Sequence, residues 1–148
     1  MSMFNEHKAA VRALCWSPFN FGTLYSGGGN NDKTIKVWNI NNSSSIHTIQ
    51  TDSQVCNITF CKHYNEFVTT HGFSKNQIMV WNAERRERIS VLDGHNTRVL
   101  HLALSPDSQS IATASGDETL KFWLIFPKEQ MPNKTGSLLS LDSLQDFR

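Results

Sequence analysis

The 148-residue chain has no long apolar run, no excess of charge of one sign and only three cysteines. No apolar stretch approaches the roughly 20 residues that a membrane-spanning helix needs, and no secretory signal pattern opens the chain. The formal net charge is +1, and Lys and Arg are scattered apart from the short run at 84–88. We therefore expect neither nucleic acid nor a membrane surface as a partner.

The three cysteines, Cys15, Cys56 and Cys61, lie in or beside apolar segments. An odd number without a secretory signal indicates a reducing compartment rather than a disulfide framework. Cys56, Cys61 and His63 are only three candidate metal ligands, with no CxxC or HxxxH partner, so we expect no zinc site and no cofactor. With 39% hydrophobic residues, the chain can bury the core of one ordinary domain.

Two sets of residues repeat along the chain with the same period. Tryptophans end three similar segments at intervals of 43 and 42 residues: TIKVWN (Trp38), QIMVWN (Trp81) and TLKFWL (Trp123). Valines open three apolar segments at intervals of 44 residues: Val11, Val55 and Val99. Two independent markers with one period indicate three structural repeats.

Each repeat divides into short strand-like segments separated by turn residues. In the first repeat these segments are 10–16, 23–28, 34–39 and 45–51; equivalent segments in the other repeats are 54–60, 77–82, 88–94, 98–104, 110–115 and 119–124. Four short strands in about 40–45 residues, with a His near the start and Trp-Asn near the end, are typical of a WD-repeat blade. We therefore predict an all-β, WD-repeat β-propeller fold. Residues 1–126 would hold three four-stranded blades (about 7–49, 50–92 and 93–126), and 127–148 a flexible tail.

Buried polar groups are expected to hold the turns of two blades. Asp32 and Asp117 each lie six residues before a blade tryptophan, where a WD-repeat Asp closes the turn and bonds the blade's histidine. The predicted structural networks are His7, Ser26, Asp32 and Trp38, and His95, Thr113, Asp117 and Trp123. They imitate a catalytic triad, but the Ser or Thr is mid-strand and no G-x-S-x-G elbow is present, so we expect no enzyme. The middle repeat has Lys75 at this position, so its turn must be held differently.

The residue before each marker valine occupies an equivalent place in its repeat. These residues are Ala10, Gln54 and Arg98. In a propeller they would converge on the top face near the central channel. Gln54 and Arg98 could then hold an extended peptide, since an arginine offers a planar fork to a carboxylate.

Three blades are too few for a closed propeller, which has about 4–8. An open row leaves two unpaired ends, which favour aggregation. We expect the chain to be part of a larger, seven-bladed propeller, although a truncated product or a self-associating one is also possible.

Several motifs together resemble the last three blades of the Fizzy and Fizzy-related proteins, the coactivators of the anaphase-promoting complex. They are HKAAVRALCWSP, SGGGNNDKTIKVWN, SQVCN, HGFSKNQ, GHNTRVLHLALSPD and SGDETLKFW, and the resemblance covers about residues 7–126. It implies a substrate-recognition and activator subunit of this ubiquitin ligase, acting in cell-cycle control in the nucleus and cytoplasm. The alternative is a generic WD-repeat interaction scaffold.

The resemblance also implies site residues. Those that receive the Lys-Glu-Asn (KEN) box of a substrate fall on Asn30, Gln54 and Arg98, and Arg98 would pair with the Glu of the box. The residue that pairs with the arginine of a destruction (D) box falls on Glu118. The terminal Phe147-Arg148 stands where the family has an Ile-Arg tail that docks on a subunit of the complex.

Overall fold

The computed structural model describes residues 3–126, which form strands in three antiparallel sheets. We call the sheets blades 1, 2 and 3. Blade 1 contains β1 (Val11–Trp16), β2 (Thr23–Gly28), β3 (Thr34–Asn39) and β4 (Ser44–Gln50); blade 2 contains β5 (Val55–Phe60), β6 (Glu66–His71), β7 (Ile78–Asn82) and β8 (Glu87–Leu92); blade 3 contains β9 (Val99–Leu104), β10 (Ser110–Ser115) and β11 (Leu120–Leu124). The predicted all-β architecture is confirmed, and these residues contain no helix able to cross a membrane.

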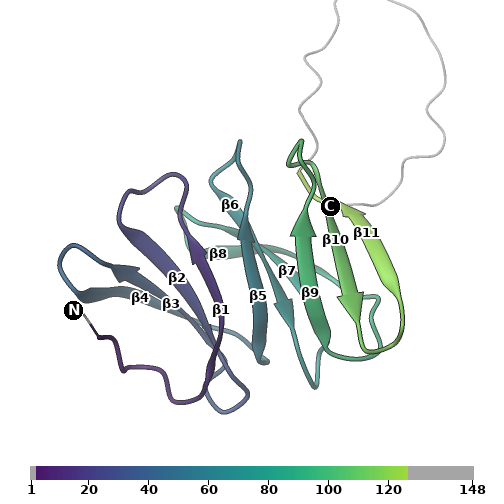
Figure 1. The fold of residues 1–148 in the computed structure, drawn as a ribbon, viewed down its shortest axis with the longest axis horizontal. Helices are drawn as coiled ribbons and strands as arrows, with labels where there is room; N and C mark the ends of the chain where they lie inside the picture. Colours follow the sequence, from purple (N-terminus) through teal and green to yellow (C-terminus); the bar gives the residue numbers. More distant parts are fainter. Residues whose placement is uncertain (1–2, 127–148) are drawn as a thin grey trace, which may run out of the picture.

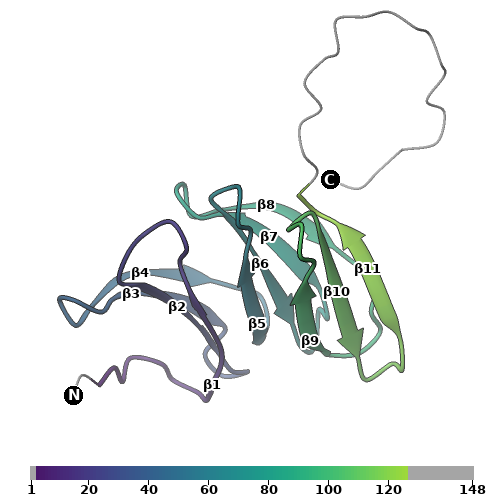
Figure 2. The ribbon, with the colours of Figure 1, turned by 45° about the horizontal axis from the view of Figure 1, so that its top comes forward.

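The first strands of the three blades, β1, β5 and β9, lie side by side, and the blades fan out behind them (Figures 1 and 2). All three begin at the same edge, at the bottom of Figure 1. Because consecutive strands are antiparallel, the β2–β3, β6–β7 and β10–β11 turns return to this edge. We call it the start edge. It gathers residues that lie more than forty positions apart in the sequence, such as Gln54 and Arg98.

Blade 3 has three strands among the described residues, where four were expected. In blades 1 and 2 the third strand is followed by a hairpin to the fourth. After β11 the N–H groups of Ile125 and Phe126 both donate to the carbonyl oxygen of Gln109, at 3.0 and 2.9 Å. The side chains of Ile125 and Phe126 are buried against blade 2. The first of these bonds has counterparts in the other blades, where Ile40 donates to Gly22 and Ala83 to Asn65.

An aromatic cluster joins blades 1 and 2. Phe67 is fully buried at its centre and stacks on Trp81, with ring planes 10° apart and centroids 6.0 Å apart. Tyr25 of blade 1 reaches across to Phe60 and Phe67, with centroids 4.9 and 5.2 Å away. Aromatic pairs in such offset or tilted geometries contribute beyond the area they bury. The cluster fixes the position of blade 1 relative to blade 2.

The two outer faces of the row carry exposed apolar side chains. Trp16 pairs in register with Leu24, which pairs with Trp38; in blade 2 Phe60 pairs with Phe67, which pairs with Trp81. Phe60 is buried against blade 1, whereas Trp16 is 58% exposed. At the other end, Phe122 of blade 3 is 72% exposed at the position where Val37 and Val80 are buried. Each free face is therefore one half of the interface that joins neighbouring blades.

Candidate functional site

Gln54 and Arg98 meet at the start edge, beside Gly72. The N–H of Gly72 donates to the carbonyl oxygen of Gln54 at 3.0 Å. A Cβ atom at Gly72 would lie 3.0 Å from Oε1 of Gln54 and 3.2 Å from Cγ of Arg98, so the two side chains approach the same point of the backbone. Gln54 is buried and Arg98 is exposed. The structure thus brings together the long polar residues that the repeat singled out, with Gln54 held in place and Arg98 open to a ligand.

Asn30 and Ala10 lie on the blade 1 side of the same edge. Asn30 is exposed in the β2–β3 turn. The preceding Gly29 packs on Ala10, since a Cβ atom there would lie 3.1 Å from the Ala10 carbonyl oxygen. Gly27, at the end of β2, contacts the side chain of Val55, the first residue of β5. The turn that carries Asn30 therefore emerges beside the start of β5.

The residues directly after the marker valines form a second set of equivalent positions, and the sequence did not reveal what distinguishes them. Each first strand has a register shift at its second residue, and these residues are Arg12, Cys56 and Leu100. Bulges often occur next to functional sites, where they redirect a side chain. No pattern in the repeat marks a bulge, because the marker valines keep their spacing whether or not the strand shifts.

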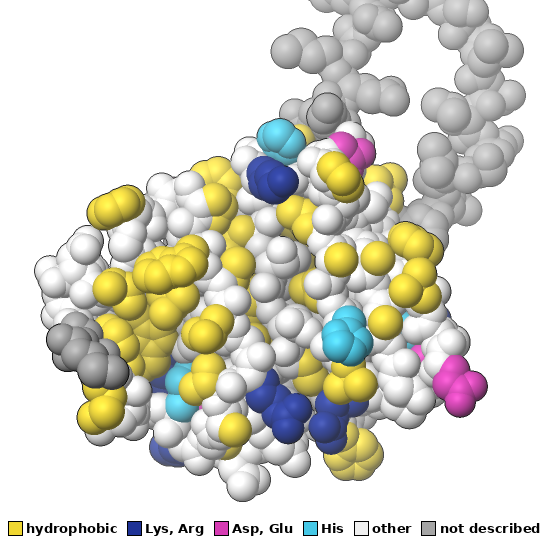
Figure 3. Space-filling model, viewed as in Figure 1, with side chains coloured by type: hydrophobic (Ala, Val, Ile, Leu, Met, Phe, Trp, Pro, Cys, Tyr) yellow, Lys and Arg dark blue, Asp and Glu magenta, His cyan; other side chains and the backbone are white. Residues whose placement is uncertain are grey.

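Arg12 and Arg98 both act on the thiol of Cys56. Burial raises the pKa of Cys56, and the two positive charges lower it by a smaller amount, so the thiol stays protonated and unreactive. Both arginines are exposed, and among residues 3–126 neither forms an ion pair with a carboxylate. Figure 3 shows basic side chains gathered at the lower margin of this face, below β5 and β9, while acidic ones lie only at its right and upper margins. The part of the start edge around Arg12 and Arg98 is therefore electropositive and suits an anionic group, whereas the β10–β11 turn carries the exposed carboxylate of Glu118.

Asp117 and Glu118 are adjacent in the sequence, but Asp117 is held by hydrogen bonds and Glu118 is exposed to solvent. Asp117 accepts from Thr119 Oγ1 at 2.6 Å and from the N–H of Asn96 at 2.9 Å, and lies 3.1 Å from Nδ1 of His95. These hydrogen bonds, the Thr119 hydroxyl first, hold the pKa of Asp117 well below its usual range. Glu118 is exposed at a positive φ of 64°. The carboxylate of Asp117 is thus structural and that of Glu118 is free to contact another molecule.

The structure brings together the members of both predicted polar networks. In blade 3, Nε2 of His95 is 2.9 Å from Thr113 Oγ1, which accepts from Trp123 Nε1 at 2.8 Å. Blade 1 repeats the arrangement: His7 contacts Asp32 and lies 2.6 Å from Ser26 Oγ, which accepts from Trp38 Nε1 at 2.7 Å. Each Ser or Thr hydroxyl is enclosed within its network, which suits a structural role rather than a nucleophile.

Blade 2 builds its network from a histidine at the end of its second strand. Trp81 Nε1 donates to Thr69 Oγ1 at 2.8 Å, and this hydroxyl lies 2.7 Å from Nε2 of His71. His71 is fully buried. The sequence offered one signal that was missed: Thr69 precedes Trp81 by twelve residues, just as Ser26 precedes Trp38. His71 was missed because it follows the Thr, whereas the other network histidines precede their blades' first strands.

Replacing Thr69 by Val should destabilise the protein. The change keeps the shape of the side chain but removes the hydroxyl that accepts from Trp81 and bonds His71, and it leaves a buried donor unpaired. We expect a loss of about 2–3 kcal/mol in the free energy of unfolding, measured by urea denaturation. Thr69→Ser keeps the hydroxyl and should cost only about 1 kcal/mol for the lost methyl group. Equal stabilities of Thr69→Val and the unmodified chain would contradict this role.

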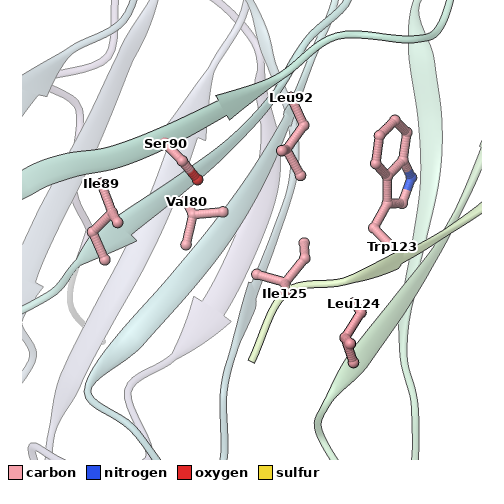
Figure 4. Close-up of a pocket in the computed structure, with 7 residues that line it drawn as sticks. All are labelled: Val80, Ile89, Ser90, Leu92, Trp123, Leu124 and Ile125. Atoms are coloured by element: carbon pink, nitrogen blue, oxygen red, sulfur yellow. The ribbon is translucent and has the colours of Figure 1, made fainter. Parts of the chain in front are cut away.

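Neither a metal centre nor an enclosed ligand cavity explains the site. Among residues 3–126, no group of three His, Cys, Asp or Glu side chains could hold a metal ion. The hollow in Figure 4, between β8 and the end of β11, is lined mainly by Val80, Leu92, Trp123 and Ile125 and holds only about 10 Å³. That is room for at most one water molecule. It is a packing gap between blades 2 and 3.

Comparison with known proteins places the chain in a family. The family model described as "WD domain, G-beta repeat" matches residues 1–39 and 86–123. The chain belongs to the WD-repeat family. It is 46% identical over 138 residues to "Protein FIZZY-RELATED 1" of Arabidopsis thaliana, covering 93% of this chain and 29% of that protein. It is 50% identical over 141 residues to "Anaphase-promoting complex subunit cdh1" of Dictyostelium discoideum, covering 95% of this chain and 18% of that protein.

A solved structure shows the same fold. A chain in the crystal structure of a mitotic checkpoint complex matches with a TM-score of 0.79 and 37% identity, over 82% of this WD-repeat chain and 39% of that one. The resemblance to the Fizzy-related proteins is confirmed, as is the propeller-type fold. The WD-repeat chain spans about 29% of the length of the Arabidopsis relative. The predicted tail residues Phe147 and Arg148 lie outside the described residues.

Proposed function

We propose that this chain is the substrate-receiving part of an activator of the anaphase-promoting complex and binds the KEN box at the start edge. The observation that carries the proposal is the meeting of Gln54 and Arg98 at Gly72, in a chain similar to proteins named as subunits of that complex. Among residues 3–126 Arg98 forms no ion pair with a carboxylate, so its guanidinium is available to donate to the Glu of the box. Gln54 and Asn30 would complete the KEN receptor beside Arg98.

The remaining parts of the proposed activator follow the same resemblance. Glu118 projects from the β10–β11 turn and would pair with the arginine of a D box, and Phe147-Arg148 would dock on a subunit of the complex. The chain presents substrates and performs no catalysis itself, in the nucleus and the cytoplasm. A generic WD-repeat scaffold would use other surfaces and would be indifferent to changes at Gln54 and Arg98.

Calorimetric titration with a KEN peptide tests the proposal. We expect specific binding, absent for a scrambled peptide of the same composition. Arg98→Ala should weaken it about 30- to 150-fold, which corresponds to about 2–3 kcal/mol for the loss of a charge-assisted pair. Arg85→Ala is the matched control, since Arg85 is exposed in the β7–β8 turn at the opposite edge of blade 2.

The thermal melt of each variant shows whether it is folded. A cooperatively melting chain that binds the KEN and scrambled peptides equally, or that tolerates Arg98→Ala, would favour the generic scaffold.

A further inference from the structure

A cleft between blades 2 and 3 opens directly beside Arg98. Its walls come from the β6–β7 turn, with Phe73 and Asn76, and from the start of β9, with Arg98 and Leu100, and its volume is about 360 Å³. Phe73 is 69% exposed and Leu100 is 41% exposed. Ligand pockets range from about 300 to 1,000 Å³, so the cleft has room for one side chain and its backbone.

Hydrogen bonds across the cleft fix its walls before any ligand arrives. Nδ2 of Asn76 in blade 2 donates to the carbonyl oxygen of Asn96 in blade 3, at 3.1 Å. On the blade 3 side, Ser115 Oγ lies 2.9 Å from the carbonyl oxygens of both Thr97 and Arg98. A cleft that is already formed loses less conformational entropy on binding.

The chemistry of the cleft differs from that of Arg98. Phe73 and Leu100 are large exposed apolar side chains on either side of it, and its described lining contains no carboxylate. Exposed apolar surface next to an unpaired guanidinium suits a ligand that combines an acidic side chain with an apolar one. The carbonyl oxygens of Asn96 and Arg98 already accept hydrogen bonds from Asn76 and Ser115, so an apolar side chain laid beside them leaves both of these groups paired.

We propose that this cleft binds an apolar side chain that immediately flanks the KEN tripeptide. This inference rests on the proposed function, because it takes the Glu of the box to lie on Arg98. In an extended peptide, residues two positions apart face the same side and lie about 6.6 Å apart. The positions two residues from the Glu are those directly before the Lys and directly after the Asn. An apolar residue at one of these positions points to the same side as the Glu and enters the cleft between Phe73 and Leu100.

Peptides that differ only in these flanking residues test the inference, by fluorescence polarisation on the full 148-residue chain. Peptides with Leu at either flank should bind about five- to tenfold more tightly than peptides with Ser at both flanks, because burial in an open cleft is partial. Phe73→Ser and Leu100→Ser should each remove this preference and leave the affinity for the Ser-flanked peptide unchanged. Phe21→Ser is the matched control: Phe21 is 97% exposed, in the β1–β2 turn at the opposite edge of its blade.

The outcomes separate this inference from the proposed function. Equal affinity for Leu- and Ser-flanked peptides, with Arg98→Ala still harmful, would overturn the cleft as a subsite and leave KEN recognition standing. A preference for Leu that survives both Phe73→Ser and Leu100→Ser would also overturn it. Failure of every KEN peptide to compete better than its scrambled form would overturn both proposals.

Discussion

Replacing Phe67 by Ala should cost about 3–5 kcal/mol of the free energy of unfolding. The Phe67 side chain is fully buried and contacts the rings of Tyr25, Phe60 and Trp81, so its removal leaves a cavity where blades 1 and 2 meet. Small domains have only about 5–15 kcal/mol of stability in total. We therefore expect a large shift in the urea midpoint, and at physiological temperature a substantial unfolded population.

Phe21→Ala provides the comparison for this core substitution. Phe21 is 97% exposed, and removal of its ring should change the free energy of unfolding by no more than about 0.5 kcal/mol. A similar small change for Phe67→Ala would mean that blades 1 and 2 do not depend on the aromatic cluster. Because the cluster fixes blade 1 beside blade 2, the Phe67 variant should also bind KEN peptide more weakly, in proportion to its unfolded fraction.

Acidification from pH 7 to pH 4 should remove about 3 kcal/mol of stability through His71 alone. Burial lowers the pKa of His71 from 6.5 to about 4, against smaller opposing effects of the Ser53 and Gln54 backbone and the Asp52 carboxylate. In the unfolded chain the imidazole binds a proton near its ordinary pKa of about 6.5. Between these values the unfolded state binds more protons than the folded state, so stability falls as the pH falls.

Below pH 4 both states carry the proton on His71 and this contribution ends. The carboxyl of Asp117, whose pKa is lowered on folding, then adds a loss of the same sign as the pH drops through its unfolded value. The structural reason for the His71 penalty is burial, because a charged imidazolium would stand in a fully buried site. Its Nε2 lies 2.7 Å from the Thr69 hydroxyl, which accepts from Trp81.

Urea denaturation at pH 4, 5, 6 and 7 measures the effect of His71. His71→Gln should flatten the dependence between pH 7 and pH 4 by about 3 kcal/mol relative to the unmodified chain, although its stability at pH 7 is lower. Phe21→Ala, at a 97% exposed position without a titratable side chain, should leave the dependence unchanged. An unchanged slope in His71→Gln would show that the imidazole is not the group that titrates.

Most strands were predictable because similar short apolar segments recur from repeat to repeat, but β6 (Glu66–His71) has no counterpart among the predicted segments. The segments 23–28, 34–39 and 110–115 were predicted with the bounds of β2, β3 and β10, and 45–51, 77–82 and 88–94 lie within one or two residues of β4, β7 and β8. The 44-residue spacing of the marker valines also placed Gln54 and Arg98 in equivalent positions of their repeats. The structure brings their side chains together at Gly72.

Features that depend on contacts between blades could not be predicted in this way. The bulges at Arg12, Cys56 and Leu100 leave the spacing of the marker residues unchanged. The cleft beside Arg98 requires knowledge of how the β6–β7 turn meets the next blade. The burial of Ile125 and Phe126 against blade 2 is likewise a contact between blades, which no local pattern encodes.

The two free faces determine how stability is shared along the row. An open row of three blades has two interfaces, whereas in a closed ring every blade is flanked on both sides. Adding a blade at one end covers Trp16 or Phe122, but the new blade presents an equivalent free face of its own. Only closure of the ring removes both free faces. Closing a ring adds an interface without ordering any further residues, which makes the last contact the most favourable one. In the open row of three blades, weakening one of the two interfaces, such as the Phe67 cluster between blades 1 and 2, therefore removes a larger share of the stability.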